Sequence, residues 1–369
     1  MRWPDPHIRM DQATASSSVS DAVPAGAPLL QLRGIDKRFV QPVDLAGKIA
    51  NLLGAKNAPA VVHAVAGVDL EIRQGEVIGV VGESGCGKST LGRVIAGINP
   101  PSAGEVSYKG KRLQEMTAAE HRAYVLGVQM IFQNPMASLN PRMRVLDIIG
   151  EAPVVHGLVP ASQKAEYVAG LMRQVGLDPD YGQRYPHQFS GGQRQRIGIA
   201  RALALKPQLI VCDEAVAALD VSIQAQVLNL FLELRRTFDL TYLFISHNLG
   251  VVGHISDRVV IMYLGRVVEV APTDTIFNRP NHPYTQALLS ELPRLDAQRR
   301  DYQPIKGELP SPLRPPTGCA FHPRCPHAMP RCSVEIPALR TLADGHISAC
   351  HLNDVAAASV AAAPIPVPA

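Results

Sequence analysis

We expect neither a membrane span nor a secretory signal in this 369-residue sequence, because it contains no long apolar run. A membrane-spanning helix needs roughly 20 consecutive apolar residues, and no stretch of this chain approaches that length. The opening residues, MRWPDPHIRM, also lack the apolar segment that marks a signal peptide. We therefore expect a cytosolic chain that meets a membrane only through partner proteins.

Aromatic residues are scarce at 5%, and the formal net charge is only +4. So small a charge neither requires nucleic acid nor excludes an anionic ligand, because a nucleotide needs only local positive charge. With 46% hydrophobic and 18% charged residues, the composition is that of a soluble globular protein. In a reducing compartment, the six cysteines are interpreted as free, catalytic or metal-binding rather than disulfide-bonded.

Low-complexity segments frame the chain. Residues 1–28 end in a Ser-, Ala- and Pro-rich stretch that predicts a flexible leader, and the Ala- and Pro-rich residues 353–369 predict a disordered tail. Between them, residues 29–275 predict a folded core with a helical insertion at about 114–205. The proline-rich residues 276–352 predict a separate extension.

The core has the pattern of an α/β fold. Strands are predicted at LLQLRGIDKRFV, VHAVAGVDLEI, VIGVV, PQLIVCDE, LTYLFISH and RVVIMYLGRVVEV, and SIQAQVLNLFLELRRTF is predicted to be helical. VIGVV is apolar on both faces, which is typical of a buried parallel strand. Another helix, SQKAEYVAGLMRQVGL, is expected to end at Gly176.

The octapeptide GESGCGKS follows the buried strand VIGVV and fits the pattern G-x-x-x-x-G-K-[ST]. Glycines let the backbone curl so that its N–H groups point at phosphates, and the following helix adds the positive end of its dipole. Lys88 can reach the β- and γ-phosphates, and the Ser89 hydroxyl can bind Mg²⁺. A chance glycine turn is the alternative. The predicted nucleotide-binding residues are Gly82, Glu83, Ser84, Gly85, Cys86, Gly87, Lys88, Ser89 and Thr90.

Two carboxylates, Asp213 and Glu214, stand at the end of the apolar strand LIVC. Ligands bind at the carboxyl ends of strands in open α/β sheets, so we expect Asp213 to hold the metal and Glu214 to polarise the attacking water. Alone, such a pair is commonly a solvated strand end. Paired with the glycine loop, it indicates hydrolysis of a nucleotide.

A second anion-binding helix start is predicted at FSGGQRQRIGIARAL, where Ser190, Gly191 and Gly192 open a helical run. A simple P-loop kinase needs only one such site for its nucleotide. With this third motif, the chain resembles the ATP-binding subunit of an ABC transporter. The resemblance implies a P-loop NTPase core with a helical subdomain and an antiparallel β subdomain.

The resemblance implies that two such domains close head to tail around two ATP molecules. Ser190, Gly191, Gly192 and Gln193 would then serve the nucleotide held by the facing subunit, and Asp220 in AALD would lie at the same interface. It also implies roles for three further residues. Gln133 would contact Mg²⁺, His247 would sense the γ-phosphate, and Phe39 would stack on adenine.

Each of these residues has a simpler structural interpretation. His247 would be a hydrogen-bonded histidine at a strand end, Gln133 an ordinary loop residue, and Phe39 a core aromatic. The sequence also departs from the family at four positions. Ala215 and Ala217 stand where proline and serine are usual, Asn248 replaces a common aspartate, and Phe189 replaces a common leucine. Since Glu214, Asp220 and His247 are kept, we expect hydrolysis to survive, although the missing proline could loosen the turn after Glu214.

Four cysteines gather in the extension at positions 319, 325, 332 and 350. Their spacing fits neither a paired C-x-x-C zinc ribbon nor a disulfide framework, but four thiolates can bind zinc or an iron–sulfur cluster. Four unrelated free thiols are the alternative. Cys86 and Cys212 lie in the predicted nucleotide site and core strand and are assigned no redox role.

The segments NHPYTQALLSELPRL and GELPSPLRPPTGCAFHPRC resemble the C-terminal extension of dipeptide and oligopeptide importer ATPases of the DppF or OppF type. The insertion between Phe39 and His63 is similar to that branch too. This resemblance implies that Cys319, Cys325, Cys332 and Cys350 bind a 4Fe–4S cluster, with Zn²⁺ as the alternative.

The same resemblance implies a set of partners: a related ATPase subunit of the DppD or OppD type, two membrane permeases and an extracytoplasmic solute-binding protein, with no nucleic acid. The chain would sit peripherally on the cytoplasmic side of the inner membrane, and the segment after Gln133 would lie near the coupling helix of a permease.

Three other functions remain open from the sequence: import of nickel or glutathione, a soluble ABC ATPase acting on DNA or ribosomes, and a metal-sensing or redox regulator. The soluble class usually carries two cassettes, or an insertion within the cassette, and this chain has neither.

Overall fold

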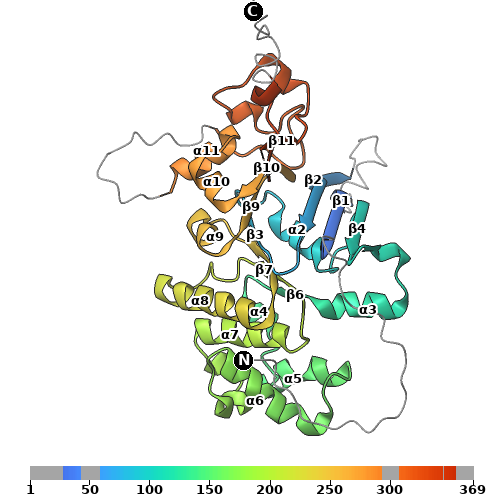
Figure 1. The fold of residues 1–369 in the computed structure, drawn as a ribbon, viewed down its shortest axis with the longest axis vertical. Coiled ribbons are helices and arrows are strands. Elements are labelled where there is room, and N and C mark those ends of the chain that lie inside the picture. The colour runs from blue at the N-terminus through green and yellow to red at the C-terminus, as the bar shows by residue number, and fades with distance from the viewer. Residues whose placement is uncertain (1–27, 43–58, 293–306, 344, 355–369) are drawn as a thin grey trace, which may run out of the picture. The chain divides into compact units, whose positions relative to one another are not determined.

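The computed structural model of the protein describes residues 28–42, 59–292, 307–343 and 345–354 (Figure 1). The predicted leader and tail lie almost wholly outside these residues, as does most of the insertion between Phe39 and His63. Contacts divide the chain into two compact units that are interleaved along the sequence. The first contains residues 1–33, 69–78 and 91–246, and the second contains residues 34–68, 79–90 and 247–369. The domain boundaries at residues 29, 276 and 353 stay predictions.

Several elements run from one unit into the other along the chain. They are β1 (Leu30–Gln41), β2 (Ala60–Ile72), β3 (Val77–Val81) and α2 (Lys88–Ile95). The strands were predicted from LLQLRGIDKRFV, VHAVAGVDLEI and VIGVV, and every residue of β3 is buried, as expected for a strand that is apolar on both faces.

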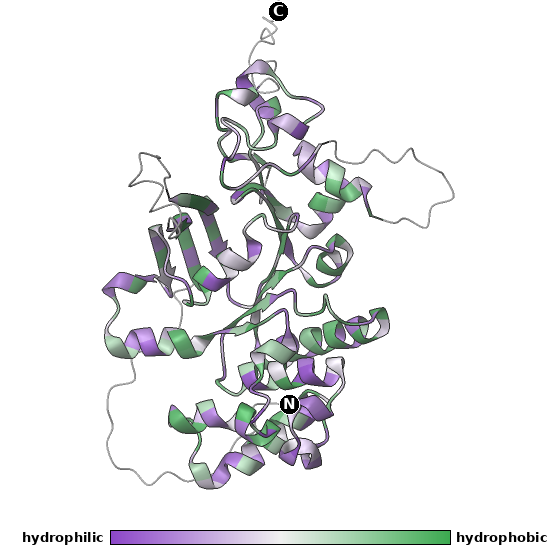
Figure 2. Ribbon diagram, turned by 180° about the vertical axis from the view of Figure 1, so that it is seen from behind, coloured by the Kyte–Doolittle hydropathy of each residue, from purple (hydrophilic) through white to green (hydrophobic). Residues whose placement is uncertain are grey.

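The first unit contains three parallel strands in the order β6 (Val128–Ile131), β7 (Leu209–Asp213) and β8 (Thr241–Ile245). All residues of β7 and β8 are buried, because the apolar sequences LIVCD and TYLFI can be covered on both faces (Figure 2). Strand β6 lies inside the segment that the sequence predicts to be helical. Its residues VQMI gain a full ladder with β7, which outweighs the local helical pattern.

The helices of the first unit are mostly amphipathic or buried on one face. They are η1 (Leu113–Glu115), α3 (Ala118–Gly127), α4 (Pro135–Ser138), α5 (Val145–Val155), η2 (Ala161–Gln163), α6 (Lys164–Gln174), η3 (Pro179–Gln183), η4 (Pro186–Gln188), α7 (Gly191–Leu203) and α8 (Val221–Phe238). This unit also holds the antiparallel pair β4 (Ala103–Tyr108) and β5 (Lys111–Arg112).

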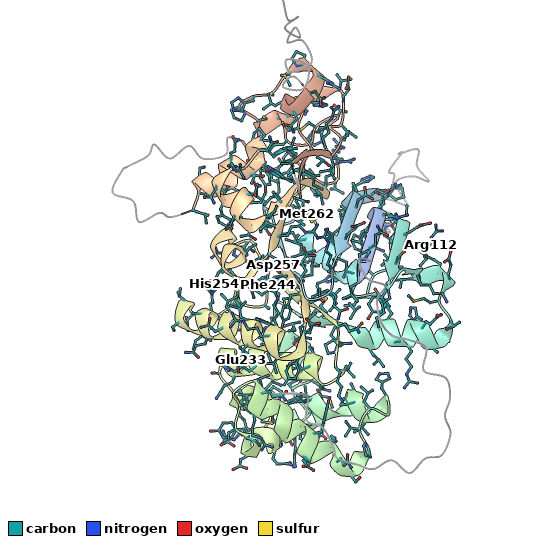
Figure 3. The ribbon with its side chains drawn as sticks, in the orientation of Figure 1. Arg112, Glu233, Phe244, His254, Asp257 and Met262 are labelled. Carbon is teal, nitrogen blue, oxygen red and sulfur yellow. The ribbon has the colours of Figure 1, made fainter. Side chains whose placement is uncertain are left out.

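Local signals explain where these helices end and what they cover. Gly176, with a φ of +69°, follows α6, which confirms the predicted helix end. Helix α8 packs on β8: the ring of Phe231 meets those of Tyr242 and Phe244 edge-on, with centroids 5.5 and 5.9 Å apart. Phe244 is labelled in Figure 3.

The second unit contains antiparallel strands in the order β11 (Arg340–Ala343), β12 (His346–Ser348), β10 (Arg266–Pro272) and β9 (Arg258–Tyr263). Its helices are α9 (Leu249–Ile255), α10 (Thr273–Asn278) and α11 (Pro283–Ser290), with short 3₁₀ turns η5 (His322–Arg324) and η6 (Pro330–Ser333). Because β12 pairs with β10, the C-terminal extension continues the sheet of this unit.

An aromatic core joins the extension to the rest of the second unit. The ring centroids of Tyr263 and Tyr284 lie 4.7 Å apart, and Phe321 packs 5.3 Å from each. All three side chains are fully buried, together with Val81 at the end of β3. The extension, despite its proline-rich sequence, therefore buries large apolar side chains.

Across the described ranges, none of the helices is both long enough and apolar enough to cross a lipid bilayer.

Candidate functional site

The glycine loop between β3 and α2 has a backbone that only glycine can adopt without strain at two positions. Gly85 and Gly87 have φ angles of +80° and +104°. A Cβ at Gly87 would lie 2.0 Å from the carbonyl oxygen of Ala64, and one at Gly82 would lie 2.2 Å from that of Met262. The loop is thus curled tightly, as a phosphate-binding loop must be.

Lys88, the first residue of α2, is buried with 4% exposure. Its Nζ donates to the carbonyl oxygens of Gly82 and Glu83, at 2.7 and 2.9 Å, and lies 3.8 Å from the Sγ of Cys86. These partners carry no full negative charge, so they hold the ammonium group at the loop without neutralising it. Such a lysine is suited to receive a phosphate.

The two cysteines outside the extension are buried in the fold. Burial raises the pKa of Cys86, and Lys88 offsets that rise only in part. Burial also raises the pKa of Cys212 well above its usual value, with Asp213 acting in the same direction. Both stay protonated thiols at neutral pH.

Gln133 and Glu214, both predicted to act in hydrolysis, are brought together in the first unit. The Gln133 amide donates from Nε2 to Oε2 of Glu214 at 2.7 Å. They meet because β6 and β7 are parallel neighbours, whose carboxyl ends lie at the same edge of the sheet. The amide therefore orients the carboxylate that is predicted to polarise the attacking water.

The backbone at Glu214 is left-handed, with a φ of +47°, which costs a residue with a Cβ roughly 1–2 kcal/mol. Its N–H donates to the carbonyl oxygen of Ile245 at 3.0 Å, and its own carbonyl accepts from the N–H of Ala217 at 3.0 Å. A hydrogen bond therefore closes the turn at the site of the missing proline. Asp213, just before it, is almost fully buried.

The predicted second anion site is the start of α7. Ser190 caps this helix: its hydroxyl accepts from the N–H of Gln193, and the Gln193 side chain accepts from the N–H of Ser190. Ser190 and Gly191 are exposed, so the helix start faces solvent. A Cβ at Gly192 would lie 2.6 Å from Ile223 of α8, which explains the glycine there.

Three further predicted residues, Phe39, Asp220 and His247, are exposed. Phe39 is 40% exposed, with the Lys37 ammonium 5.2 Å from its ring centroid, so it is not a core aromatic. Asp220 precedes α8 without capping it through its side chain, and His247 is exposed as well. Asn248 accepts from the backbone N–H groups of Gly250 and Val251 and so caps α9, a role that sequence reasoning missed.

The four cysteines of the extension line one small cavity, together with residues such as His282 and Phe321. The cavity encloses about 10 Å³, which is roughly the volume that one water molecule needs. Cys319 and Cys332 are tied by a backbone hydrogen bond of 2.8 Å, and Cys350 is delivered by the strand pairing of β12 with β10. The structure thus brings together four cysteine side chains that are widely separated in the sequence.

Burial raises the pKa of Cys350 to about 11, and Cys319, Cys325 and Cys332 act in the same direction. Burial likewise raises the pKa of Cys319 and Cys325. The thiols are not paired as disulfides. In the described ranges, no three His, Cys, Asp or Glu side chains are already arranged to hold a metal ion. The four thiols line one cavity, but a metal centre at these cysteines stays a prediction.

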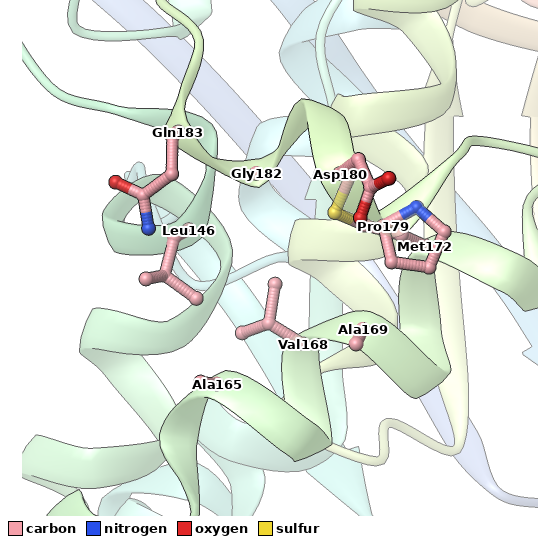
Figure 4. Close-up of a pocket in the computed structure, with 9 residues that line it drawn as sticks. All are labelled: Leu146, Ala165, Val168, Ala169, Met172, Pro179, Asp180, Gly182 and Gln183. Atoms are coloured by element: carbon pink, nitrogen blue, oxygen red, sulfur yellow. The ribbon is translucent and has the colours of Figure 1, made fainter.

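A second cavity, of about 370 Å³, lies in the first unit among α5, α6 and η3 (Figure 4). It is lined mainly by apolar side chains, with polar groups at one edge. The lining residues are Leu146, Ala165, Val168, Ala169, Met172, Pro179, Asp180, Gly182 and Gln183. No sequence motif indicated this cavity, since its residues come from separate amphipathic segments.

The profile of the family described as ABC transporter matches residues 65–217, and that described as oligopeptide/dipeptide transporter, C-terminal region, matches residues 268–332. The oligopeptide transport ATP-binding protein AppF of Bacillus subtilis is 51% identical over 328 residues, which is 88% of this chain and 97% of that protein. The chain belongs to the ABC transporter family.

Within this family, the di/tripeptide transport ATP-binding protein DppF of Pseudomonas aeruginosa is 50% identical over 294 residues, covering 79% of this ABC protein and 90% of that one. Among solved structures, cbiO1 from Clostridium perfringens, described as part of an ABC transporter complex, is 23% identical with a TM-score of 0.56. The structural match covers 69% of this chain and 92% of the cbiO1 chain. The fold of the ABC ATPase predicted from the sequence is thereby confirmed.

Proposed function

We propose that this ABC ATPase powers an importer of dipeptides or oligopeptides. The observation that carries the proposal is the coexistence of the curled phosphate loop with the oligopeptide/dipeptide transporter C-terminal region. Relatives that are about half identical over most of the chain are named as oligopeptide and di/tripeptide transport ATP-binding proteins, which supports this cargo class.

In the proposed reaction, the glycine loop and Lys88 bind the phosphates of ATP, and Phe39 stacks on its adenine. Ser89, Gln133 and Asp213 supply the hydroxyl, amide and carboxylate oxygens that would hold Mg²⁺, which neutralises charge on the phosphates. Glu214 polarises the attacking water, in the orientation set by Gln133, and His247 senses the γ-phosphate.

The exposed start of α7 and the exposed Asp220 suit a nucleotide bound by another subunit. We propose that the chain pairs with a related ATPase subunit, so that Ser190, Gly191, Gly192 and Gln193 complete the partner's site. Closing and reopening of this pair would move two permeases, to which an extracytoplasmic solute-binding protein delivers the peptide.

The apolar cavity among α5, α6 and η3 supports contact with a permease, because a buried apolar anchor is what such a cavity accepts. The segment after Gln133 leads directly into α4 and α5. The ATPase would thus lie peripherally on the cytoplasmic face of the membrane.

We also propose that Cys319, Cys325, Cys332 and Cys350 bind a metal centre, a 4Fe–4S cluster or in its place Zn²⁺. Such a centre would fix the shape of the extension by joining its segments. Anaerobically prepared protein should contain iron and sulfide in stoichiometric amounts. Zinc in place of iron and sulfide would refute the cluster but keep the four-thiolate site. Protein that contains neither iron nor zinc would refute both the cluster and the site.

The Glu214→Gln substitution tests the proposed catalysis. We expect ATP binding to persist and ATP turnover to fall by roughly 10²–10⁴-fold, because only the water-polarising carboxylate is lost. Undiminished turnover would refute the role of Glu214. Peptide uptake by vesicles containing the full transporter tests the cargo: nickel or glutathione uptake instead would favour the alternative importers, and no coupling to transport would favour a soluble ATPase.

A further inference from the structure

An ion pair connects the glycine loop to the cysteine-bearing extension within the second unit. The guanidinium Nη1 of Arg324 lies 3.0 Å from Oε1 and 2.9 Å from Oε2 of Glu83. The Arg324 side chain is only 8% exposed and that of Glu83 23%, so water screens this pair poorly. The contact spans 241 residues of sequence.

Glu83 is held at three points, and each holds a different part of the residue. Arg324 binds its carboxylate, the Tyr284 hydroxyl accepts from its backbone N–H at 2.9 Å, and its carbonyl accepts from Lys88 Nζ at 2.9 Å. The last contact belongs to the lysine that is proposed to bind phosphate. A shift of Glu83 would therefore move the carbonyl that positions this lysine.

Arg324 is itself fixed by its surroundings. It ends the 3₁₀ turn η5, between Cys319 and Cys325, and its Nη1 lies 3.3 Å from the Tyr263 hydroxyl. Phe321, in the preceding turn, packs against Tyr263 and Tyr284. The Nε–H of Arg324 is buried without a partner among the described residues. A buried donor left unpaired is unfavourable, so the contacts to Glu83 and Tyr263 must hold the side chain in place.

The charge of Glu83 makes this pairing important for nucleotide binding. A carboxylate on a loop that receives a triphosphate repels the ligand unless a cation neutralises it. Arg324 supplies that cation from the extension, and its guanidinium group keeps its charge when buried.

We propose that Arg324 is a positioning residue for the ATP site: it anchors and neutralises Glu83 and thereby sets the glycine loop and Lys88. This inference rests on the proposed function of the loop as the ATP site. It gives the extension a direct role in nucleotide binding, because the segment between Cys319 and Cys325 holds the arginine.

The test measures the Kd of Mg-ATP by calorimetry on the full chain and its variants. Arg324→Ala should weaken binding at least about tenfold, because the lost partner leaves Glu83 charged and poorly solvated. Arg324→Lys should lose less, since the charge remains. In Arg324→Ala combined with Glu83→Gln, affinity should partly recover, which a merely structural role for Arg324 would not produce.

Two further variants separate the possible failures. Arg340→Ala removes the ion pair that an exposed arginine of the extension makes with Asp354, and it should leave the Kd unchanged. Lys88→Ala should abolish binding, and if it does not, the proposed ATP site itself is wrong. If Lys88→Ala abolishes binding while Arg324→Ala stays within about twofold of the wild type, or if the double variant shows no recovery, the positioning role is overturned. If Arg324→Ala does not fold, Arg324→Lys carries the test. Arg324→Lys must then bind ATP measurably more weakly than Arg340→Ala does. Equal affinity of these two variants would overturn the proposal.

Discussion

The glycine loop and the cysteine cluster lie in the same compact unit, but they are built in different ways. The loop is one continuous stretch whose backbone makes the site, through left-handed glycines and close approaches to Ala64 and Met262. The cluster is made of side chains, brought together by turns and by the pairing of β12 with β10. A site made by a continuous backbone tolerates little change of residue, whereas a site made by distant side chains depends on the packing that gathers them.

The largest effect is expected from Gly87→Ala in the loop. A Cβ would meet the Ala64 carbonyl at 2.0 Å, at a φ of +104°, so the loop must shift. We expect a loss of roughly 2–4 kcal/mol of stability and of measurable ATP binding. Thermal unfolding and ATP titration check this result.

Gly110→Ala is the matched control for that substitution. Gly110 also has a left-handed φ, of +78°, but a Cβ there would meet nothing within 4 Å. It should cost only about 1 kcal/mol and leave ATP binding intact. If the two variants behaved alike, the close approach of the loop backbone would not be what requires glycine.

The next effect concerns the cluster. Cys325→Ser should lower the bound metal and reduce Tm by roughly 5 °C or more, because metal binding contributes folding free energy to such a segment. ATP affinity should fall as well, although less than in Arg324→Ala. Metal analysis, thermal unfolding and ATP titration measure the three quantities.

Cys212→Ala, in the buried strand β7, serves as the control for the cluster. It should leave the metal content unchanged, since Cys212 does not line the cavity of the four cysteines. Equal metal loss in both variants would contradict the assignment of the ligands.

A smaller effect is expected from Tyr284→Phe. The hydroxyl that accepts from the Glu83 N–H is lost, which should cost about 1–2 kcal/mol and weaken ATP binding severalfold. Tyr124→Phe removes a comparable buried hydrogen bond, to the carbonyl of Ile95 at 2.7 Å. Tyr124→Phe should cost similar stability without changing ATP affinity. If ATP affinity fell equally in the two variants, the hydrogen bond from Glu83 to Tyr284 would have no specific effect on the ATP site.

The smallest effect is expected at the exposed start of α3, which belongs to neither site. The hydrogen bond from Lys111, with those from Thr117, lowers the pKa of Glu120 to about 2. Because this folded-state pKa lies below the usual 4.5, the stabilisation is complete above pH 4.5 and is lost as the pH falls through about 2. The difference in unfolding midpoint between wild type and Glu120→Gln should therefore shrink towards low pH. If that difference grew instead, the pKa of Glu120 would not be lowered by folding.

The sequence predicted the parts of the molecule that depend on local chemistry. The buried strands β3 and β7, the end of α6 at Gly176 and the glycine loop all follow from residue type and spacing. The hydrogen bond between Gln133 and Glu214 follows from the parallel order of β6 and β7. The sequence predicted that both residues act in hydrolysis but not that they contact each other.

Other features depend on contacts that sequence spacing cannot reveal. Strand β6 forms because β7 lies beside it, against a helical local pattern. The ion pair of Arg324 with Glu83 joins residues 241 positions apart, and neither residue is unusual in its own segment. The core that Phe321 shares with Tyr263 and Tyr284 was likewise concealed by the proline-rich texture of the extension.

The most direct test of the link between extension and loop is hydrogen exchange of the backbone N–H groups in residues 82–88 without nucleotide. In Arg324→Ala these groups should exchange faster than in the wild type, while the N–H groups of α6 exchange at the same rate in both proteins. Unchanged exchange in the loop of a folded Arg324→Ala variant would contradict the account.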